Sequence, residues 1–153
     1  MEKTINQIKE ELNEIAVQHR QINHFYFGNF IDAISGDAVD YTLMNATLQQ
    51  GSFGENYVEI PLSITVCDKY NEGNNRQIDE VHSDCLRILR DIYVIFKQQR
   101  FQEYLDITAE PQPTPFINKG HDITAGWSMD LILKIYDDEN WCAIPMDDYD
   151  FGN

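Results

Sequence analysis

Basic residues are scarce in this chain. It has 11 lysines and arginines against 26 aspartates and glutamates, so its formal net charge is −15. Binding of duplex nucleic acid relies on lysine and arginine contacts with phosphates, and the few cations here are scattered along the sequence. The composition therefore argues against a duplex-binding surface. It favours solubility, a basic partner, or a surface along which DNA slides without sticking.

Long apolar runs and a leader sequence are also missing. No apolar run is long enough to predict a transmembrane helix. Residues 1–4 lack the basic-then-apolar order of a signal peptide. We therefore expect a protein used in the cytosol, or carried in a particle assembled there. The length of 153 residues predicts one domain, and the 42% apolar and 12% aromatic content argues against wholesale disorder.

Recognisable catalytic, metal and nucleotide motifs are absent. The three cysteines, Cys67, Cys85 and Cys142, match no zinc or redox spacing, so we interpret them as small buried hydrophobic residues. The histidines form no HExxH pair, and no glycine-rich phosphate loop follows a strand. His19 lies on an apolar helix stripe, which favours a hydrogen-bonded structural histidine over a metal ligand. We predict no catalytic, cofactor-binding or metal-binding residues.

Two weaker possibilities for chemistry concern a histidine–cysteine pair and the acidic C-terminal segment. His82 and Cys85 are three residues apart on one predicted helix, which places them near each other. Cys85 falls on the buried stripe, however, where the pKa of its thiol rises and its reactivity falls. In the C-terminal segment Asp147, Asp148 and Asp150 can bind a cation loosely, but they lack the ligand order of an EF-hand. A solvated acidic tail is the preferred interpretation.

The clearest structural unit is a strand followed by a helix. Apolar residues alternate over Tyr57–Cys67, which predicts a half-buried strand. The apolar spacing changes to threes and fours over Gln77–Phe96, which predicts an amphipathic helix. The asparagine- and glycine-rich segment Lys69–Asn75 between them predicts a turn, and Asn74 or Asn75 is the expected helix cap.

The N-terminal third predicts a helix followed by extended segments. Thr4–Ile22 has a narrow apolar stripe, with Thr4 as the expected N-cap. The aromatic segment Asn23–Ile34 predicts a short strand or an extended crossing with a bend at Gly28. Asp40–Gln49 predicts a second strand. The expected connection Gln50–Asn56 pairs it antiparallel with the Tyr57 strand, whose Pro61 requires an edge or a bulge.

The C-terminal third predicts a loop and one long strand. Phe101–Ala109 is either a strand or the last turns of the helix, and the proline-rich segment Glu110–Asp122 predicts a loop. Ile123–Tyr136 predicts the last strand. Its fourteen residues span roughly 45 Å at about 3.3 Å each, more than one small core needs. Part of it should therefore pair with something else, or the strand should bend at Gly126. Trp141–Pro145 predicts a short apolar return.

These elements together predict an α+β fold. We expect a mostly antiparallel sheet with two amphipathic helices packed on it. The expected organisation is one α+β domain over residues 1–145, followed by an acidic C-terminal tail over residues 146–153.

The ordered set of motifs resembles the small neck and tail-connector proteins of tailed phages, in particular those of crAss-like phages. The resemblance covers about residues 5 to 145. It is carried by His19-Arg20-Gln21-Ile22-Asn23, Phe27-Gly28-Asn29 with Asp32, the strand ending at Asp68, Asp79-Glu80-Val81, Ser83-Asp84, Ile88-Leu89-Arg90-Asp91, Gly126-Trp127 and Cys142-Ala143-Ile144-Pro145.

This resemblance implies a ring-forming structural virion protein with a tail-terminator-like fold. Such proteins form closed rings between portal and tail, and DNA passes through the lumen at ejection without sequence-specific binding. The implied partners are copies of the chain and other neck, portal or tail proteins, with no membrane, no cofactor and no enzyme activity. The implied location is the virion neck or tail, after assembly in the host cytoplasm.

Apolar residues beyond what one small core needs, and long segments able to extend to a neighbour, identify candidate contact residues. We predict that the interface with other copies or partners uses the following aromatic residues and prolines: Phe25, Tyr26, Phe27, Phe30, Phe53, Pro113, Pro115, Phe116 and Trp141. An alternative function is an acidic adaptor or inhibitor that binds a basic partner, and a third is a small metal-dependent enzyme.

Overall fold

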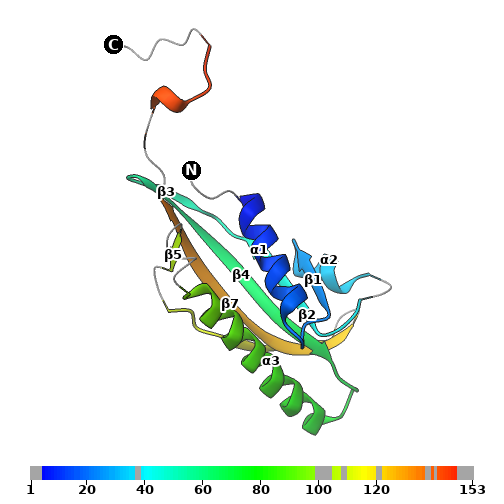
Figure 1. The fold of residues 1–153 in the computed structure, drawn as a ribbon. Coiled ribbons are helices and arrows are strands. Elements are labelled where there is room, and N and C mark those ends of the chain that lie inside the picture. The colour runs from blue at the N-terminus through cyan, green and yellow to red at the C-terminus, as the bar shows by residue number, and fades with distance from the viewer. Residues whose placement is uncertain are drawn as a thin grey trace.

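The computed structural model describes residues 5–36, 39–98, 105–107, 110–119, 122–136, 139 and 141–147. The elements in chain order are α1 (Ile5–Gln18), β1 (His24–Phe27), α2 (Phe30–Ile34), β2 (Leu43–Leu48), β3 (Ser52–Gly54), β4 (Tyr57–Lys69), α3 (Asn75–Phe96), β5 (Leu105–Ile107), β6 (Thr114–Lys119), β7 (Ile123–Tyr136) and the 3-10 turn η1 (Trp141–Ala143). The predicted α+β class is confirmed (Figure 1).

The strands of the described residues form one mixed sheet. Its order is β1-β2-β4-β7-β5, with β3 paired to β4 and β6 paired to β7. Only β1 and β2 run parallel; the other pairs are antiparallel, as expected of a mostly antiparallel sheet. The predicted antiparallel pairing of the second strand with the Tyr57 strand is confirmed, from Leu43 opposite Cys67 to Leu48 opposite Leu62.

The long last strand finds its partner within the same chain. β7 pairs with β4 along thirteen positions, from Tyr57 opposite Tyr136 to Lys69 opposite Thr124, and β5 and β6 pair with parts of its other edge. The expectation that its extra length needs an external partner is therefore wrong. A Cβ at Gly126 would lie 2.1 Å from the Val66 carbonyl oxygen, so glycine permits this close pairing of the two backbones.

Both long helices cover the same face of the sheet. Alternate residues of β4 and β7, such as Ile64 and Leu131, point into one core with Leu12 of α1 and Ile88 of α3. This confirms the two predicted amphipathic helices. α3 begins two residues before the predicted Gln77 and ends at the predicted Phe96.

Two predicted structural details are confirmed at the ends of elements. Asn74 caps α3, because its side chain accepts a hydrogen bond from Gln77 N at 3.1 Å. The Pro61 carbonyl accepts a hydrogen bond from Gln49 N at 2.9 Å. The nitrogen and the oxygen of a strand residue point to the same neighbour, so the Pro61 nitrogen also faces the interruption in pairing between β2 and β3. Pro61 therefore lies at a bulge, where a missing donor costs little.

The opposite face of the sheet has a smaller apolar cluster at one end. Ala33 and Ile34 of α2 pack there on Leu43 and Cys67. Sequence periodicity missed α2, because five residues are too few to show a helical repeat. Its stability is local, since Asn29 caps it by accepting from Ile31 N at 2.9 Å. Gly28, with φ 148°, makes the predicted bend before it.

Two other predictions about connections are wrong. The segment Glu110–Asp122, expected as a loop, contains strand β6, with Pro115 opposite Trp127. Proline is tolerated because β6 pairs only with β7 among the described residues. The expected connection Gln50–Asn56 contains strand β3. The expected N-cap Thr4 lies outside the described residues. Of the segment Phe101–Ala109, predicted as a strand or as the last turns of the helix, the structure describes only β5, which is a strand.

Candidate functional site

The most exposed apolar side chain that the structure describes is at one end of the sheet. Phe53 of β3 is 92% exposed. β3 pairs with β4 on one edge only within the described part of the chain, and a two-residue turn at Glu55 and Asn56 joins them into a hairpin. We call Ser52–Gly54 with this turn the hairpin tip. An exposed ring on a strand with an open edge makes this tip a candidate contact surface, because an open edge can pair with another chain.

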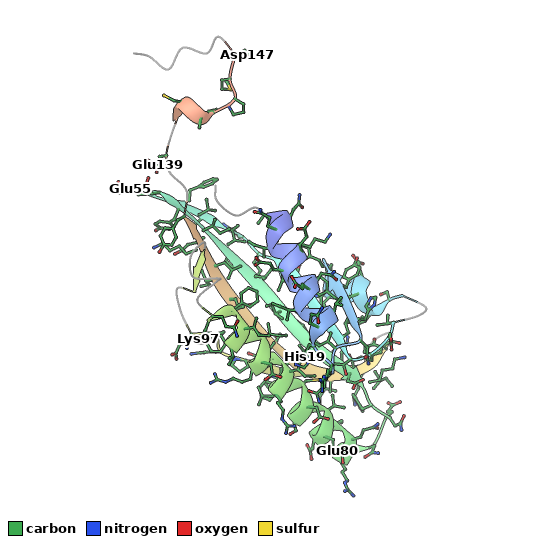
Figure 2. The ribbon with its side chains drawn as sticks, in the orientation of Figure 1. His19, Glu55, Glu80, Lys97, Glu139 and Asp147 are labelled. Atoms are coloured by element: carbon green, nitrogen blue, oxygen red, sulfur yellow. The ribbon has the colours of Figure 1, made fainter. Side chains whose placement is uncertain are left out.

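The hairpin tip is held in place by polar contacts. Asn56 N donates to Glu139 Oε1 at 3.2 Å, and Glu139 N donates to Asn56 Oδ1 at 3.4 Å. The Lys134 ammonium lies 4.1 Å from the ring centroid of Tyr57, at the start of β4. Figure 2 shows Glu55 and Glu139 together at this end. The tip is therefore a braced, acidic projection that carries one exposed ring.

A second candidate surface lies between α1 and the outer strand β1. An open groove of about 580 Å³ is lined by Asn6, Lys9, Glu10, Asn13, Phe25, Tyr26 and Phe27. The Lys9 ammonium lies 5.6 Å from the ring centroid of Phe27. β1 pairs only with β2 among the described residues, so the backbone groups on its other edge have no strand partner there. We call this the edge groove.

A buried amide holds β1 in place. Asn45 of β2 is 1% exposed. With its amide nitrogen turned toward β1, it donates to Tyr26 O at 3.0 Å and to Gly28 O at 3.2 Å. Both carbonyls lie beside the bend that leads into α2. This side chain therefore fixes the aromatic segment against the sheet, because a buried amide is retained where its hydrogen bonds are satisfied.

A third group of aromatic residues gathers where β6 meets α2 and α3. Phe30 and Phe116 stack edge to face, with ring centroids 5.6 Å apart. Trp127 Nε1 donates to the His82 carbonyl at 2.8 Å, and the two rings lie 6.0 Å apart. His82 Nε2 also lies 3.0 Å from the Phe116 carbonyl oxygen. These contacts join β6 and β7 to α3, so they have a structural role.

Polar side chains close the same end of the molecule. The Tyr41 hydroxyl donates to Asp122 Oδ2 at 2.5 Å. Lys69 Nζ lies 3.6 Å from Asp122 Oδ1 and 5.2 Å from the Tyr41 ring centroid. Burial, reinforced by the hydrogen bond to Asp122, raises the pKa of the Tyr41 hydroxyl well above its usual range. This tyrosine therefore stays protonated and serves as a hydrogen-bond donor.

The His82 and Cys85 pair is not arranged for nucleophilic chemistry. Burial raises the pKa of the Cys85 thiol to about 12, as expected from its place on the helix stripe. Burial likewise raises the pKa of the Cys67 thiol well above its usual range.

His19 contacts Asp91 of α3, with Nε2 2.9 Å from Oδ2, which confirms the predicted structural histidine.

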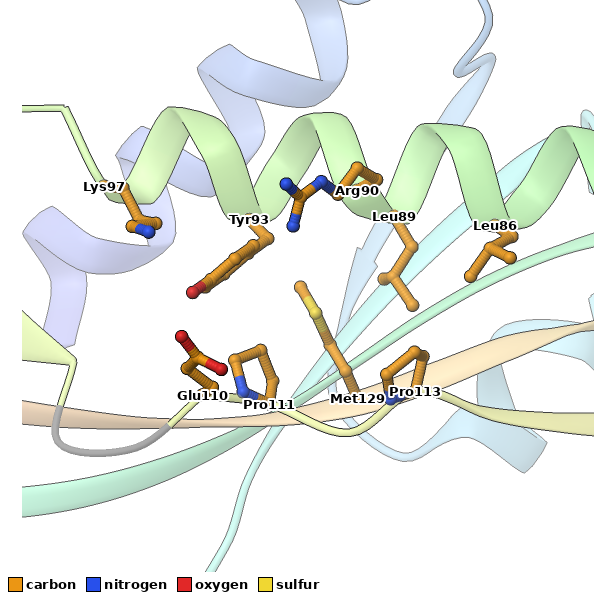
Figure 3. A pocket seen from close by; sticks show the side chains of 9 residues that line it. All are labelled: Leu86, Leu89, Arg90, Tyr93, Lys97, Glu110, Pro111, Pro113 and Met129. Carbon is orange, nitrogen blue, oxygen red and sulfur yellow. The ribbon is translucent and has the colours of Figure 1, made fainter.

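A groove lies along the second half of α3. It has a volume of about 250 Å³ and is lined by Leu86, Leu89, Arg90, Tyr93, Lys97, Glu110, Pro111, Pro113 and Met129 (Figure 3). We call this the α3 groove. Its volume is below the range of about 300–1,000 Å³ typical of small-molecule sites. It suits one or two side chains of a peptide better than a whole cofactor.

The predicted contact residues are distributed over several surfaces. Phe25, Tyr26 and Phe27 are half-buried along the edge groove, whereas Phe30 and Phe116 pack together. Phe53 is at the hairpin tip. Pro113 lines the α3 groove, and Pro115 is exposed on β6. The backbone of Trp141 is in η1, but its side chain lies outside the description. The predicted apolar return does not rejoin the core, because Cys142–Asp147 are exposed. The prediction that the cysteines are buried is therefore confirmed for Cys67 and Cys85 and wrong for Cys142.

The cations of the α3 groove are not among the residues predicted from the sequence. Arg90 and Lys97 are two of only 11 basic residues, and both line one groove of a very acidic protein. Their spacing on the helix was visible in the sequence. The facing segment at Glu110 was not, because the groove exists only once the segment around Pro111 is brought beside α3.

Comparisons with known proteins add no identification. No protein-family model matches the chain, and no curated protein matches it significantly. No helix in the described ranges has the length and apolar character that crossing a membrane requires. Nor do three or more His, Cys, Asp or Glu side chains gather as a metal-binding group within those ranges.

Proposed function

We propose that this chain is a structural subunit that assembles head to tail with copies of itself into a closed ring. As the resemblance of its motifs suggests, the proposed ring is part of a phage neck or tail, as a head–tail connector or tail terminator. There it joins portal to tail and surrounds passing DNA in the virion. The observation that carries the proposal is the braced hairpin tip, with Phe53 92% exposed on a strand that has an open edge.

A head-to-tail ring needs two different surfaces that complement each other. The hairpin tip and the edge groove provide such a pair. β3 pairs with one end of β4, at Tyr57–Glu59, and β1 follows β2 beside the other end. Because the two surfaces lie at opposite ends of the sheet, a copy that binds through one leaves the other open for the next copy.

Chemistry at the two surfaces is also complementary. The edge groove presents the half-buried rings of Phe25 and Phe27, against which the ring of Phe53 can be buried. Its lining also contains Lys9, a cation suited to Glu55 of the acidic tip, together with one carboxylate, Glu10. The net charge of −15 supports a passage for DNA, because an acidic lining repels phosphate and keeps DNA from adhering.

The test is the assembly state of the full chain after a change at the tip. In Phe53→Ser the exposed ring is removed, and we expect the assembly to dissociate to monomers in native mass spectrometry. Val17→Ser is the matched control, because Val17 is 71% exposed on α1 and lines neither surface. It should assemble like the unmodified chain.

Two outcomes contradict the proposal. One is an unmodified chain that stays monomeric at high concentration, which would favour an acidic adaptor for a basic partner. The other is a Phe53→Ser variant that forms rings as readily as the Val17→Ser control. Each variant should keep the circular dichroism spectrum of the folded chain, because both side chains are exposed and removing them leaves no cavity.

A further inference from the structure

The segment after β7 has an unusual combination of exposed apolar and acidic residues. Ile144 is 48% exposed and Met146 is 50% exposed, and Asp147 follows them. The sequence then continues as Asp148-Tyr149-Asp150-Phe151, with no basic residue. Figure 1 shows η1, at the start of this segment, standing clear of the sheet beyond the β3 end. The described part of the tail thus exposes apolar side chains next to an acidic one, and the sequence that follows is of the same mixed apolar and acidic type.

The α3 groove has the complementary character. Leu89 and Met129 are 1% and 4% exposed and form an apolar floor. Above them, Arg90 and Lys97 supply positive charge, and both lie within 5.5 Å of the Tyr93 ring centroid. Figure 3 shows Arg90, Tyr93 and Lys97 on the helix side of this groove, facing Glu110 and the two prolines.

Among the described residues, few acidic side chains lie along the groove. Along the second half of α3, Asp91 contacts His19 at 2.9 Å on a different side from the groove lining. Glu110 is the one carboxylate among the described residues of the lining. The two cations therefore outnumber it, in a chain whose formal net charge is −15. An acidic ligand is therefore attracted to this positive groove, whereas most of the remaining surface of the acidic protein repels it.

The position of Arg90 is not explained by helix electrostatics. A cation in the last turn of a helix is stabilised by the helix dipole, which accounts for Lys97 at the C-cap. That effect fades beyond the last turn, and Arg90 lies six residues before the end of α3 at Phe96. Arg90 is exposed, lies over the Tyr93 ring and lines the groove, so it places a positive charge where an acidic ligand can reach it.

We propose that the α3 groove of one copy binds the acidic tail, residues 144–150, of a neighbouring copy. The apolar side chains of the tail occupy the floor at Leu89 and Met129, and its aspartates meet Arg90 and Lys97. The inference rests on the proposed ring, because it supplies a second contact between the same neighbours. A neighbour is favoured over the same chain because η1 leads away from the sheet (Figure 1). The groove, in contrast, is lined by Met129 in the middle of β7.

The direct test is carbodiimide crosslinking of the full chain, which joins a carboxylate to a nearby ammonium group. Equal amounts of ordinary and nitrogen-15-labelled protein are mixed, unfolded, refolded together and crosslinked. We expect peptides that join Lys97 to Asp147, Asp148 or Asp150, with half of them combining a light and a heavy chain. Crosslinked peptides of a single isotope only would place the tail in its own groove and overturn the proposal.

Charge reversal supplies the second test. Arg90→Glu should weaken assembly about tenfold in apparent dissociation constant, as expected when one partner of an interfacial charge pair is reversed. Arg76→Glu is the control. This substitution gives the same net charge as Arg90→Glu, but the Arg76 side chain is 91% exposed and lies at the other end of α3. The control should change the apparent dissociation constant by less than about twofold, since exposed charges away from the contact contribute little.

The two proposals fail in different ways. If the unmodified chain assembles, yet Arg90→Glu assembles equally well and no tail crosslink to Lys97 forms, the tail contact is wrong and the ring remains. If the unmodified chain is monomeric throughout, the ring itself is wrong, and the light–heavy crosslinks are absent for that reason.

Discussion

Trp127 provides the sharpest test of how β6 and β7 are attached to α3. Its half-buried ring packs against the main core, and its indole nitrogen donates to the His82 carbonyl at 2.8 Å. We predict that Trp127→Ala destabilises folding, whereas Trp127→Phe, which keeps most of the ring contact, has a much smaller effect. The comparison separates the packing of the ring from its hydrogen bond.

The magnitude follows from the burial of the ring. A half-buried Trp127 covers roughly 100 Å² of apolar surface, which at ~25 cal/mol per Å² contributes ~2.5 kcal/mol. The hydrogen bond adds about 1 kcal/mol. Trp127→Ala should therefore lower the free energy of unfolding by ~3.5 kcal/mol, within the values of about 3–5 kcal/mol for buried tryptophan. Trp127→Phe should cost about 1 kcal/mol, mainly the hydrogen bond.

The assay is urea unfolding followed by circular dichroism at one fixed protein concentration, because assembly stabilises the folded chain by mass action. Unchanged stability of Trp127→Ala, combined with loss of assembly, would refute the reasoning. Trp127 would then belong to a contact between copies and not to the attachment of β7 to α3.

Three further predictions concern buried polar groups. Thiol labelling at neutral pH should modify the exposed Cys142 and spare Cys67 and Cys85 until urea is added; labelling of all three in the folded chain would contradict their burial. The two buried thiols have raised pKa values in the folded chain, so below pH 9.0 they should not affect the pH dependence of stability. Between pH 9.0 and about 12 the unfolded chain releases protons that the folded chain retains, and stability should fall with rising pH. A flat profile in urea unfolding across that range would exclude this linkage. Asn45→Leu should lower the free energy of unfolding by about 1–3 kcal/mol, because the Tyr26 carbonyl loses a donor. Hydrogen exchange should locate the loss at β1, and protection there equal to the unmodified chain would show that the amide is dispensable.

Local periodicity is sufficient to predict α3 and β7, two of the longest elements of the described core. The last strand has the predicted bounds, Ile123–Tyr136, and α3 ends at the predicted Phe96. In both, the apolar spacing repeats often enough within the element to identify its type. The Asn74 cap and the raised pKa of Cys85 also follow from local position, since both depend on where a residue falls on one helix.

The missed elements depend on partners that are distant in the sequence. β6 contains Pro115 and reads as a loop, but pairing with β7 makes it a strand. β3 has only three residues, and α2 has five, too few for a repeat to be visible. The extra length of β7 was recognised, but its partner was misjudged, because β4 pairs with it along thirteen positions.

The candidate contact surfaces were predictable only in part. Phe53 was identified by its residue type, and the structure leaves it exposed at the hairpin tip. Phe30 and Phe116 were selected by the same criterion but pack on each other, because α2 brings one ring to the other. The α3 groove requires Arg90 and Pro111, twenty-one positions apart, to lie side by side. Nothing in the local pattern of either segment indicates that arrangement.

The central claim is that copies of this chain form a closed ring through the hairpin tip. Cryo-electron microscopy of the purified full chain tests it most directly. The account predicts class averages of a ring with cyclic symmetry, in which Phe53 of each subunit is buried against β1 of the next. Single copies in the images at every concentration, or rings in which Phe53 remains in solvent, would contradict it.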